Sequence, residues 1–156
     1  MNTRKPLRLV QYDYSLGGAY FITICVKDRS PILSEICDSA VGAGIARPKL
    51  SAIGEIVDRS VRSIPLHYEN ASVDNYVIMP DHVHLLLRIN AEDGRAMPAP
   101  TTISGIIQQF KGVVTKQCRR EIWQKSFYDH VIRNELDYLE TWQYIENNPA
   151  ERAEIK

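Results

Sequence analysis

The chain has 156 residues, 44% of them hydrophobic, and its 19 basic residues balance its 19 acidic ones. This length predicts a single domain, residues 1–156, with a substantial core. No apolar run approaches about 18 residues, so no transmembrane helix or membrane partner is expected. The N-terminus lacks a signal-peptide apolar core, which predicts a cytoplasmic protein. Three cysteines without CxxC spacing are expected to be reduced structural thiols.

Hydrophobic periodicity, together with glycine and proline punctuation, divides the chain into a series of elements. In the first half of the chain we expect a basic N-terminal arm at 1–18, a strand at Ala19–Lys27, a loop insertion at 34–49 and a helix at Leu50–Ser63 closed by Pro65. The middle should hold two strands, at Tyr76–Met79 and Val83–Leu87, followed by a linker at Ala91–Pro100. The last part should hold a helix at Thr102–Arg120, a strand at Tyr128–Ile132, and a final helix from Glu135 to about Asn147 ended by Pro149. Thr101 or Thr102 and then Asn134 are suitable N-caps for the last two helices.

The order of these elements is strand, helix, strand, strand, helix, strand, followed by an extra helix. The first six match the split βαβ pattern of ferredoxin-like folds. The predicted fold class is therefore α+β, a ferredoxin-like sandwich with an antiparallel sheet, helices on one of its faces, and an appended C-terminal helix.

Two histidines follow the turn at Pro80-Asp81, which joins the two central strands. His82 and His84 are two residues apart, so on a strand both imidazoles point to one face, while Val83, Leu85 and Leu87 point to the other. Two adjacent imidazoles on a rigid strand can bind one divalent metal ion. The pair alone is incomplete as a metal site and needs a further ligand.

The last helix offers Tyr144 and Asn148, which are four residues apart and share a face. At about 100° per residue, the apolar side chains form a stripe from which Tyr144 is roughly 160° away. These side chains are Leu136, Leu139, Trp142 and Ile145. A tyrosine that serves packing is expected within such a stripe. Tyr144 beside a metal-bound phosphate could act as a nucleophile, with Tyr138 and Tyr128 as rival candidates.

Charge is distributed unevenly along the chain. Residues 103–133 hold six basic and two acidic side chains, whereas residues 134–156 hold six acidic and two basic ones. The basic segment, and the arm before it, could contact nucleic-acid phosphates without reading sequence. The candidate DNA-binding residues are Arg4, Lys5, Arg8, Lys111, Lys116, Arg119 and Arg120.

Four ordered motifs, MPDHVHLLL, QQFK, WQKSFYDHVIR and YIENNP, resemble those of the REP-associated tyrosine transposases, which belong to the single-tyrosine, His-hydrophobic-His transposases. The opening YDYSLGGAYFITICVKDR is similar to that family too. The resemblance implies that His82, His84 and Asn148 bind Mg²⁺ or Mn²⁺ and that Tyr144 is the nucleophile. Asp81 stands where the family motif more often has Asn.

The resemblance further implies an endonuclease and strand transferase that acts on single-stranded DNA, on palindromic repeats that form hairpins. Such an enzyme passes through a 5′-phosphotyrosine intermediate, as a monomer or a homodimer. Two alternatives stay open from the sequence. One is a ferredoxin-like nucleic-acid-binding domain without catalysis, and the other is a metal-dependent nuclease that uses water as the nucleophile.

Overall fold

The structure is a computed structural model, and it describes residues 17–36, 48–90 and 102–155. Its main elements are the strands β1 (Gly17–Cys25), β4 (Ala71–Ile78), β5 (His82–Asn90) and β6 (Tyr128–Val131) and the helices α2 (Ala52–Arg62), α4 (Ile103–Cys118) and α5 (Glu135–Ile155). Shorter elements are η2 (Lys27–Arg29), β2 (Ser34–Glu35), β3 (Lys49–Leu50) and α3 (Ile64–His67). The arm that holds Arg4, Lys5 and Arg8 lies outside the described residues.

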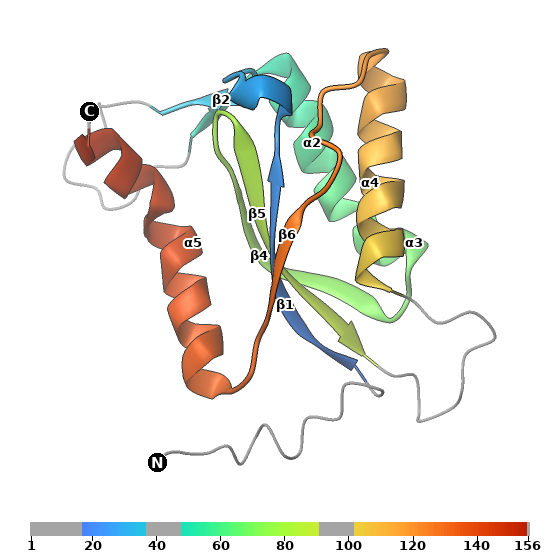
Figure 1. The fold of residues 1–156 in the computed structure, drawn as a ribbon, viewed down its shortest axis with the longest axis vertical. Coiled ribbons are helices and arrows are strands. Elements are labelled where there is room, and N and C mark those ends of the chain that lie inside the picture. Colours follow the sequence, from blue (N-terminus) through green and yellow to red (C-terminus); the bar gives the residue numbers. More distant parts are fainter. Residues whose placement is uncertain (1–16, 37–47, 91–101, 156) are drawn as a thin grey trace.

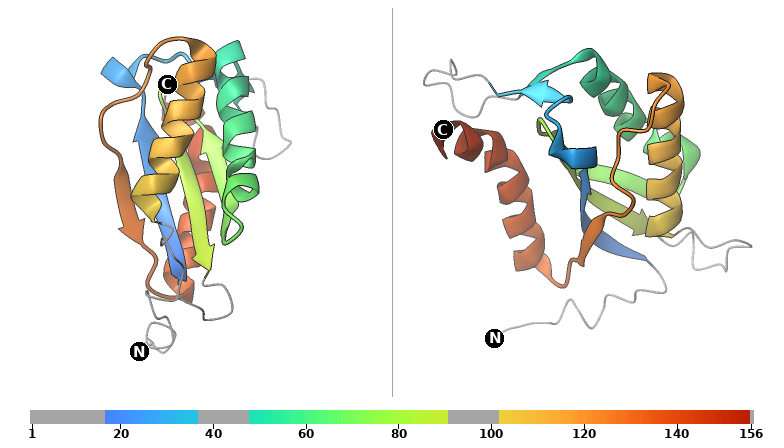
Figure 2. Two further views of the ribbon diagram at one scale, coloured as in Figure 1. Left: turned by 90° about the vertical axis from the view of Figure 1, so that its right-hand side faces the viewer. Right: turned by 45° about the horizontal axis from the view of Figure 1, so that its top comes forward.

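The four long strands form one antiparallel sheet in the order β4-β5-β1-β6. This is the strand order of the ferredoxin-like fold, and the predicted fold class is confirmed. Helices α2 and α4 cover one face of the sheet, and α5 lies across the other (Figures 1 and 2). The protein therefore has three layers, with the sheet in the middle.

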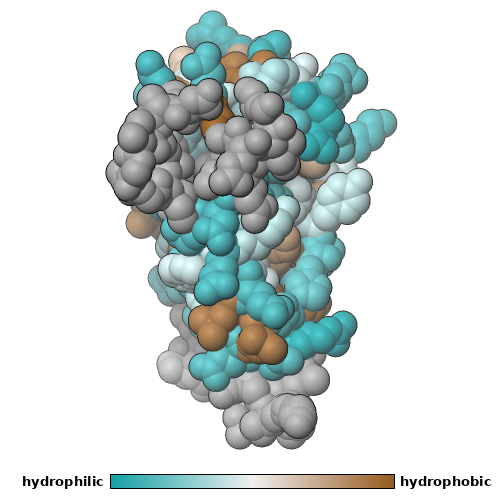
Figure 3. Space-filling model, turned by 90° about the vertical axis from the view of Figure 1, so that its left-hand side faces the viewer, coloured by the Kyte–Doolittle hydropathy of each residue, from teal (hydrophilic) through white to brown (hydrophobic). Residues whose placement is uncertain are grey.

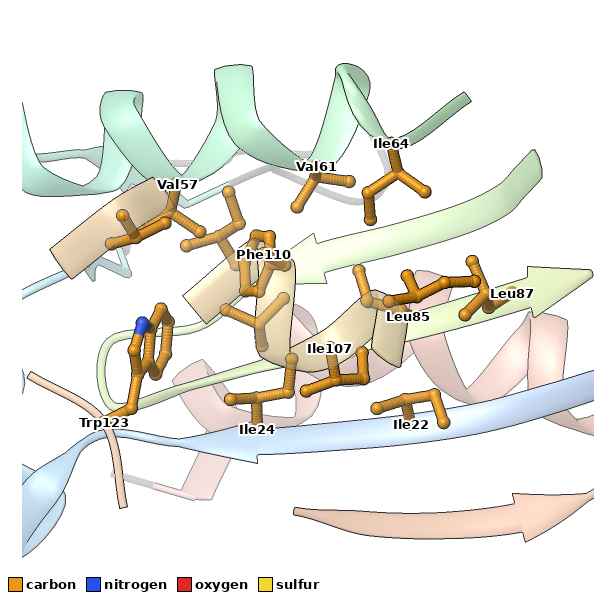
Figure 4. Packing of buried hydrophobic residues seen from close by; sticks show 14 of the residues in the cluster. Ile22, Ile24, Val57, Val61, Ile64, Leu85, Leu87, Ile107, Phe110 and Trp123 are labelled. Carbon is orange, nitrogen blue, oxygen red and sulfur yellow. The ribbon is translucent and has the colours of Figure 1, made fainter. Parts of the chain in front are cut away.

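The larger core lies between the sheet and the α2–α4 layer. Figure 4 shows Val57, Ile107 and Phe110 from the helices packed against Ile22 and Leu85 from the strands. The predicted alternation of β5 is confirmed, because Val83, Leu85 and Leu87 all belong to this core and are fully buried. A smaller cluster, which includes Leu86 and Ile145, lies between the sheet and α5.

Several predicted boundaries are wrong for identifiable reasons. Helix α2 ends at Arg62, close to the predicted Ser63, but Pro65 stands in the first turn of the short helix α3, where proline's missing N–H is harmless. Pro149 does not end α5, which continues to Ile155; an internal proline removes one backbone hydrogen bond but need not stop a helix. Within the expected loop insertion, β2 and β3 pair as a two-stranded ribbon, and residues 37–47 lie outside the described part.

Candidate metal centre and nucleophile

The histidine pair, His82 and His84, opens β5 directly after the turn at Pro80-Asp81. Both side chains are buried, and their ring centroids lie 4.6 Å apart. The turn is held by neighbouring backbone, since Val26 N–H donates to the Asp81 carbonyl at 2.9 Å and Leu33 N–H to the Pro80 carbonyl at 3.0 Å. Both imidazoles project to the sheet face that α5 covers, which we call the site face. The predicted pairing of the two rings on one face is confirmed.

His82 is oriented by Asp81, the residue in which the chain departs from the family motif. His82 Nδ1 lies 2.7 Å from Asp81 Oδ1, and Arg29 Nε donates to Asp81 Oδ2 at 3.1 Å. Burial raises the pKa of Asp81, but the hydrogen bonds from His82 and Arg29 outweigh it and hold the pKa below its usual value. A carboxylate on Nδ1 fixes the tautomer that leaves Nε2 for a metal. Arg29 was missed by the sequence analysis, and it reaches Asp81 from a left-handed turn, with φ of 54°.

His84 has a polar partner on one ring nitrogen only. Its Nδ1 lies 3.0 Å from Thr23 Oγ1 on β1, while its Nε2 is buried and has no hydrogen-bond partner among the described residues. Burial is the main cause that lowers the pKa of His84 to about 3, so the ring is neutral near pH 7. With the proton on Nδ1, that N–H donates to Thr23 and Nε2 keeps its lone pair. A buried lone pair without a partner is unfavourable and fits a metal ligand.

This pKa predicts a pH dependence of the metal-free protein. Since the folded pKa of about 3 lies below the ordinary 6.5, the unfolded chain binds a proton between these values that the folded chain does not. Stability is thus complete above about pH 6.5 and falls as the pH drops towards 3. Urea titrations in EDTA give the free energy of unfolding at each pH. Between pH 7 and 4 this free energy should fall less in His84→Leu than in the wild type, by on the order of 3 kcal/mol. Parallel pH profiles for the two proteins would contradict this.

Tyr144 lies beside the histidine pair. Its ring centroid is 5.4 Å from that of His84 and 5.8 Å from that of Phe21, which approaches it edge-on. The side chain keeps 46% of its surface exposed, so its hydroxyl-bearing ring is held by neighbours and still open to a substrate. The structure therefore brings Tyr144 of α5 to the histidine pair of β5, as the sequence analysis predicted.

The predicted packing stripe of α5 is right for Ile145, which is fully buried, and wrong for its two leucines. Leu136 is 65% exposed and Leu139 54% exposed, whereas the helix presents Thr141, Ile145 and Asn148 to the sheet as buried residues. The outer surface of α5 is largely hydrophilic with a small apolar patch (Figure 3). The apolar stripe misleads here because the site face of the sheet is mixed, with the histidine pair beside an apolar cluster, so the helix that covers it packs through a mixed face as well. Tyr144 lies at the flank of that packing side, not opposite to it.

A β-bulge in β4 anchors α5 to the sheet. The register with β5 shifts between Val73 and Asn75, so Asp74 and Asn75 both reach α5. The Tyr138 hydroxyl donates to Asp74 Oδ2 at 2.6 Å, and Asn75 Nδ2 donates to Glu146 Oε2 at 3.0 Å. Burial and the Asp74 hydrogen bond raise the pKa of Tyr138, which makes it a poor nucleophile. Tyr138 thus serves to position the helix that carries Tyr144.

Asn148, the expected third ligand, is 7% exposed and follows Tyr144 by one helical turn. The described residues contain no cluster of three or more His, Cys, Asp or Glu side chains suited to a metal ion. A metal would therefore depend on two imidazoles, an amide oxygen and outside ligands such as phosphate oxygens. This donor set fits a divalent ion with open positions, and its nitrogen ligands suit a first-row transition ion better than Mg²⁺.

The candidate DNA-binding residues on α4 lie away from the site face. Lys116, Arg119 and Arg120 are exposed at the C-terminal end of α4, the helix that covers the opposite face of the sheet (Figure 1). Lys111 is engaged internally, since its Nζ donates to the Gln124 carbonyl at 2.9 Å and to that of Ser126 at 3.2 Å. The structure therefore does not bring these four residues to the histidine pair.

Comparison with known proteins gives a consistent result. An uncharacterized protein of Haemophilus influenzae is 32% identical to the chain, over 94% of the chain and 88% of that protein. The REP-associated tyrosine transposase of Escherichia coli is 28% identical, over 92% of the chain and 73% of its own length. No family model matches the chain. Among the described residues, no helix has the length and apolarity to cross a membrane.

A solved structure shares the fold. The structure of a REP-associated tyrosine transposase bound to a REP hairpin superposes with a TM-score of 0.65 at 21% identity, covering 88% of the chain and 69% of that protein. The sheet, the α2–α4 layer and the α5 layer therefore have the fold of that structure. The chain is thus similar over nearly its whole length to REP-associated tyrosine transposases.

Proposed function

We propose that the chain nicks and rejoins single-stranded DNA in a metal-dependent reaction that passes through a 5′-phosphotyrosine intermediate. The observation that carries this proposal is the position of Tyr144, whose ring lies 5.4 Å from the ring of His84. A phenol that is partly exposed, a buried imidazole with an unpartnered nitrogen and a second buried imidazole thus converge on the site face. This arrangement suits nucleophilic attack on a phosphodiester.

The metal-binding residues in this proposal are His82, His84 and Asn148, with Mn²⁺ or Mg²⁺ as the ion. When bound, the ion would neutralise charge on the phosphate oxygens and favour the phenolate. Asp81 and Thr23 hold the two imidazoles by their Nδ1 atoms. That support places both rings before any substrate arrives, so little reorganisation is needed on binding.

The reaction itself balances without another reactant. The Tyr144 oxygen attacks the phosphorus, the bond from phosphorus to the 3′ oxygen breaks, and the proton lost by the phenol is taken up by the released 3′ oxygen, which becomes a hydroxyl. The product carries the 5′ phosphate on Tyr144. Attack by a 3′ hydroxyl on this ester reverses the step, so strands can be cut and joined while the number of phosphodiester bonds is maintained.

Hairpin-forming DNA is the partner that we propose. The E. coli relative is named a REP-associated transposase, and the structure of similar fold holds a REP hairpin. Arg4, Lys5 and Arg8 remain candidate contacts, together with the exposed basic end of α4. Phosphate contacts of this kind would fix the position of the DNA without specifying its sequence.

The test is incubation of the protein with 5′- or 3′-labelled single-stranded hairpin DNA and Mn²⁺, followed by a denaturing gel. We expect a protein-linked DNA band from the 3′-labelled strand only, because the 5′ phosphate stays on the protein. The band should disappear with EDTA. Cleavage without any adduct would favour water as the nucleophile, and binding without cleavage across several hairpins would favour a non-catalytic binding protein.

Asp81 provides a more specific prediction about the metal. Asp81→Ala should weaken Mn²⁺ binding about 10- to 100-fold in calorimetric titrations, because a second-layer carboxylate holds His82 in its ligating tautomer. Asp81→Asn keeps a hydrogen-bond acceptor at the Oδ1 position and should lose less Mn²⁺ affinity than Asp81→Ala. Asp129→Asn, an exposed carboxylate on β6, serves as the control. Equal Mn²⁺ affinity for Asp81→Ala and wild type would contradict a role for Asp81 in orienting His82.

A further inference from the structure

Tyr128 extends the row of residues that contains the histidine pair. In the sheet register, Thr23 on β1 is opposite His84 on β5 and also opposite Tyr128 on β6. Directly opposed residues of antiparallel strands project to the same face. His84, Thr23 and Tyr128 therefore form one row across the site face. Two strand spacings, about 10 Å, separate the backbones of His84 and Tyr128.

The Tyr128 ring is open to solvent. It is 67% exposed, more than any other aromatic side chain among the described residues, and β6 is an edge strand. A single exposed aromatic is common on protein surfaces, so exposure by itself indicates nothing. Its position matters, because the ring stands at the open end of a row that starts at the proposed metal centre.

A positive charge at the histidine end of this row suits a phosphate there. Arg29 Nε donates to Asp81 Oδ2 at 3.1 Å, and Arg29 Nη2 lies 3.5 Å from His82 Nδ1. Arg29 keeps 52% of its side chain exposed, so it can meet a ligand while bonded to Asp81. Asp129 follows Tyr128 on the strand and is paired with Ile22, a residue of the opposite face. His130, the next residue on the site face, is bonded to Asp137 of α5.

We propose that Tyr128 is a stacking platform for an unpaired nucleobase adjacent to the phosphate that Tyr144 attacks. This inference rests on the proposed function and adds a binding subsite to it. A ring of this kind accepts any base, because every base has a π-face, and it supplies affinity without sequence readout. The unpaired strand then runs along the row from the histidine pair to the sheet edge, with Arg29 beside its phosphates.

The test measures binding of hairpin oligonucleotides by fluorescence anisotropy, in Mn²⁺, with Tyr144→Phe protein so that no strand is cut. Each oligonucleotide carries one abasic site at a different unpaired position. We expect one position at which base removal weakens binding about tenfold. In Tyr128→Val, which keeps a β-branched residue on the edge strand, binding should be weak from the start, and the same base removal should have no further effect.

Two further variants make the result specific. Tyr128→Phe keeps the ring and should give the parent profile, which also separates stacking from any chemistry of the hydroxyl. Trp142→Leu, on α5 and 37% exposed, is the matched aromatic control and should also give the parent profile. An unchanged abasic profile in Tyr128→Val would overturn the platform.

The platform and the proposed function fail in different ways. Adduct formation by the protein with intact Tyr144, combined with an abasic profile that ignores Tyr128, would overturn the platform alone. Absence of both the adduct and single-strand binding in the wild type would overturn the proposed function and the platform with it. The subsite would be established by one unpaired position at which base removal weakens binding in the parent protein and in every other variant, but not in Tyr128→Val.

Discussion

Tyr144→Phe is expected to abolish the covalent protein–DNA adduct while leaving the fold and hairpin binding intact. The substitution removes one oxygen from a side chain that is already 46% exposed, so the contacts of its ring with His84 and Phe21 can persist. If Tyr144 is the nucleophile, both cleavage and strand transfer should fall by on the order of 10³ or more, since no neighbouring group can replace the attacking atom. Denaturing gels of labelled hairpin DNA measure both activities.

Two tyrosines of similar chemistry provide the controls. Tyr138→Phe loses the hydrogen bond to Asp74 and should lower stability by about 1 kcal/mol, yet it should still form the adduct. Tyr128→Phe should form it as well. If the adduct persists in Tyr144→Phe but disappears in one of the two controls, the nucleophile is the tyrosine that was replaced in that control. Cleavage without an adduct in Tyr144→Phe would instead indicate attack by water.

Local patterns were sufficient to predict the framework that holds the histidine pair. The alternation of β5 is a property of five consecutive residues, and the structure reproduces it. Thr102 and Asn134 cap the helices that follow them, with side-chain oxygens that accept backbone N–H bonds from Gly105 and Asp137. These features depend on neighbours within four positions, which is the range over which sequence patterns are informative.

Features that depend on pairing across the sheet could not be predicted in the same way. Thr23 is 61 positions from its partner His84, and Arg29 is 52 positions from Asp81. Alternation on β1 indicates only that Thr23 shares a face with Phe21. The packing side of α5 was predicted only in part, because periodicity assumes that the whole apolar stripe is buried, whereas Ile145 is buried and Leu136 and Leu139 are exposed. Where a helix covers a functional site, its buried side can include polar residues such as Thr141 and Asn148, and an apolar stripe alone then does not identify that side.

His84→Leu is expected to abolish metal binding and, at the same time, to leave the metal-free protein as stable as the wild type or more stable. The wild-type ring buries a nitrogen without a partner among the described residues, which costs about 1–3 kcal/mol. Leucine removes that unpaired group and has a similar size. Calorimetric titration with Mn²⁺ should show at least a 100-fold loss of affinity, because one of two imidazole ligands is gone. Urea unfolding in EDTA gives the stability.

A loss of Mn²⁺ affinity without a loss of stability distinguishes a metal ligand from a structural histidine. A histidine that stabilises the fold would lose stability on substitution by leucine, with no particular effect on metal affinity. His67→Ala is the control, an exposed histidine at the end of α3, and it should change neither quantity. Added Mn²⁺ should raise the stability of the wild type and not that of His84→Leu, since only a protein that binds the ion in its folded state is stabilised by it. Loss of stability in His84→Leu with unchanged Mn²⁺ affinity would contradict the metal centre, and the buried nitrogen would then need another explanation.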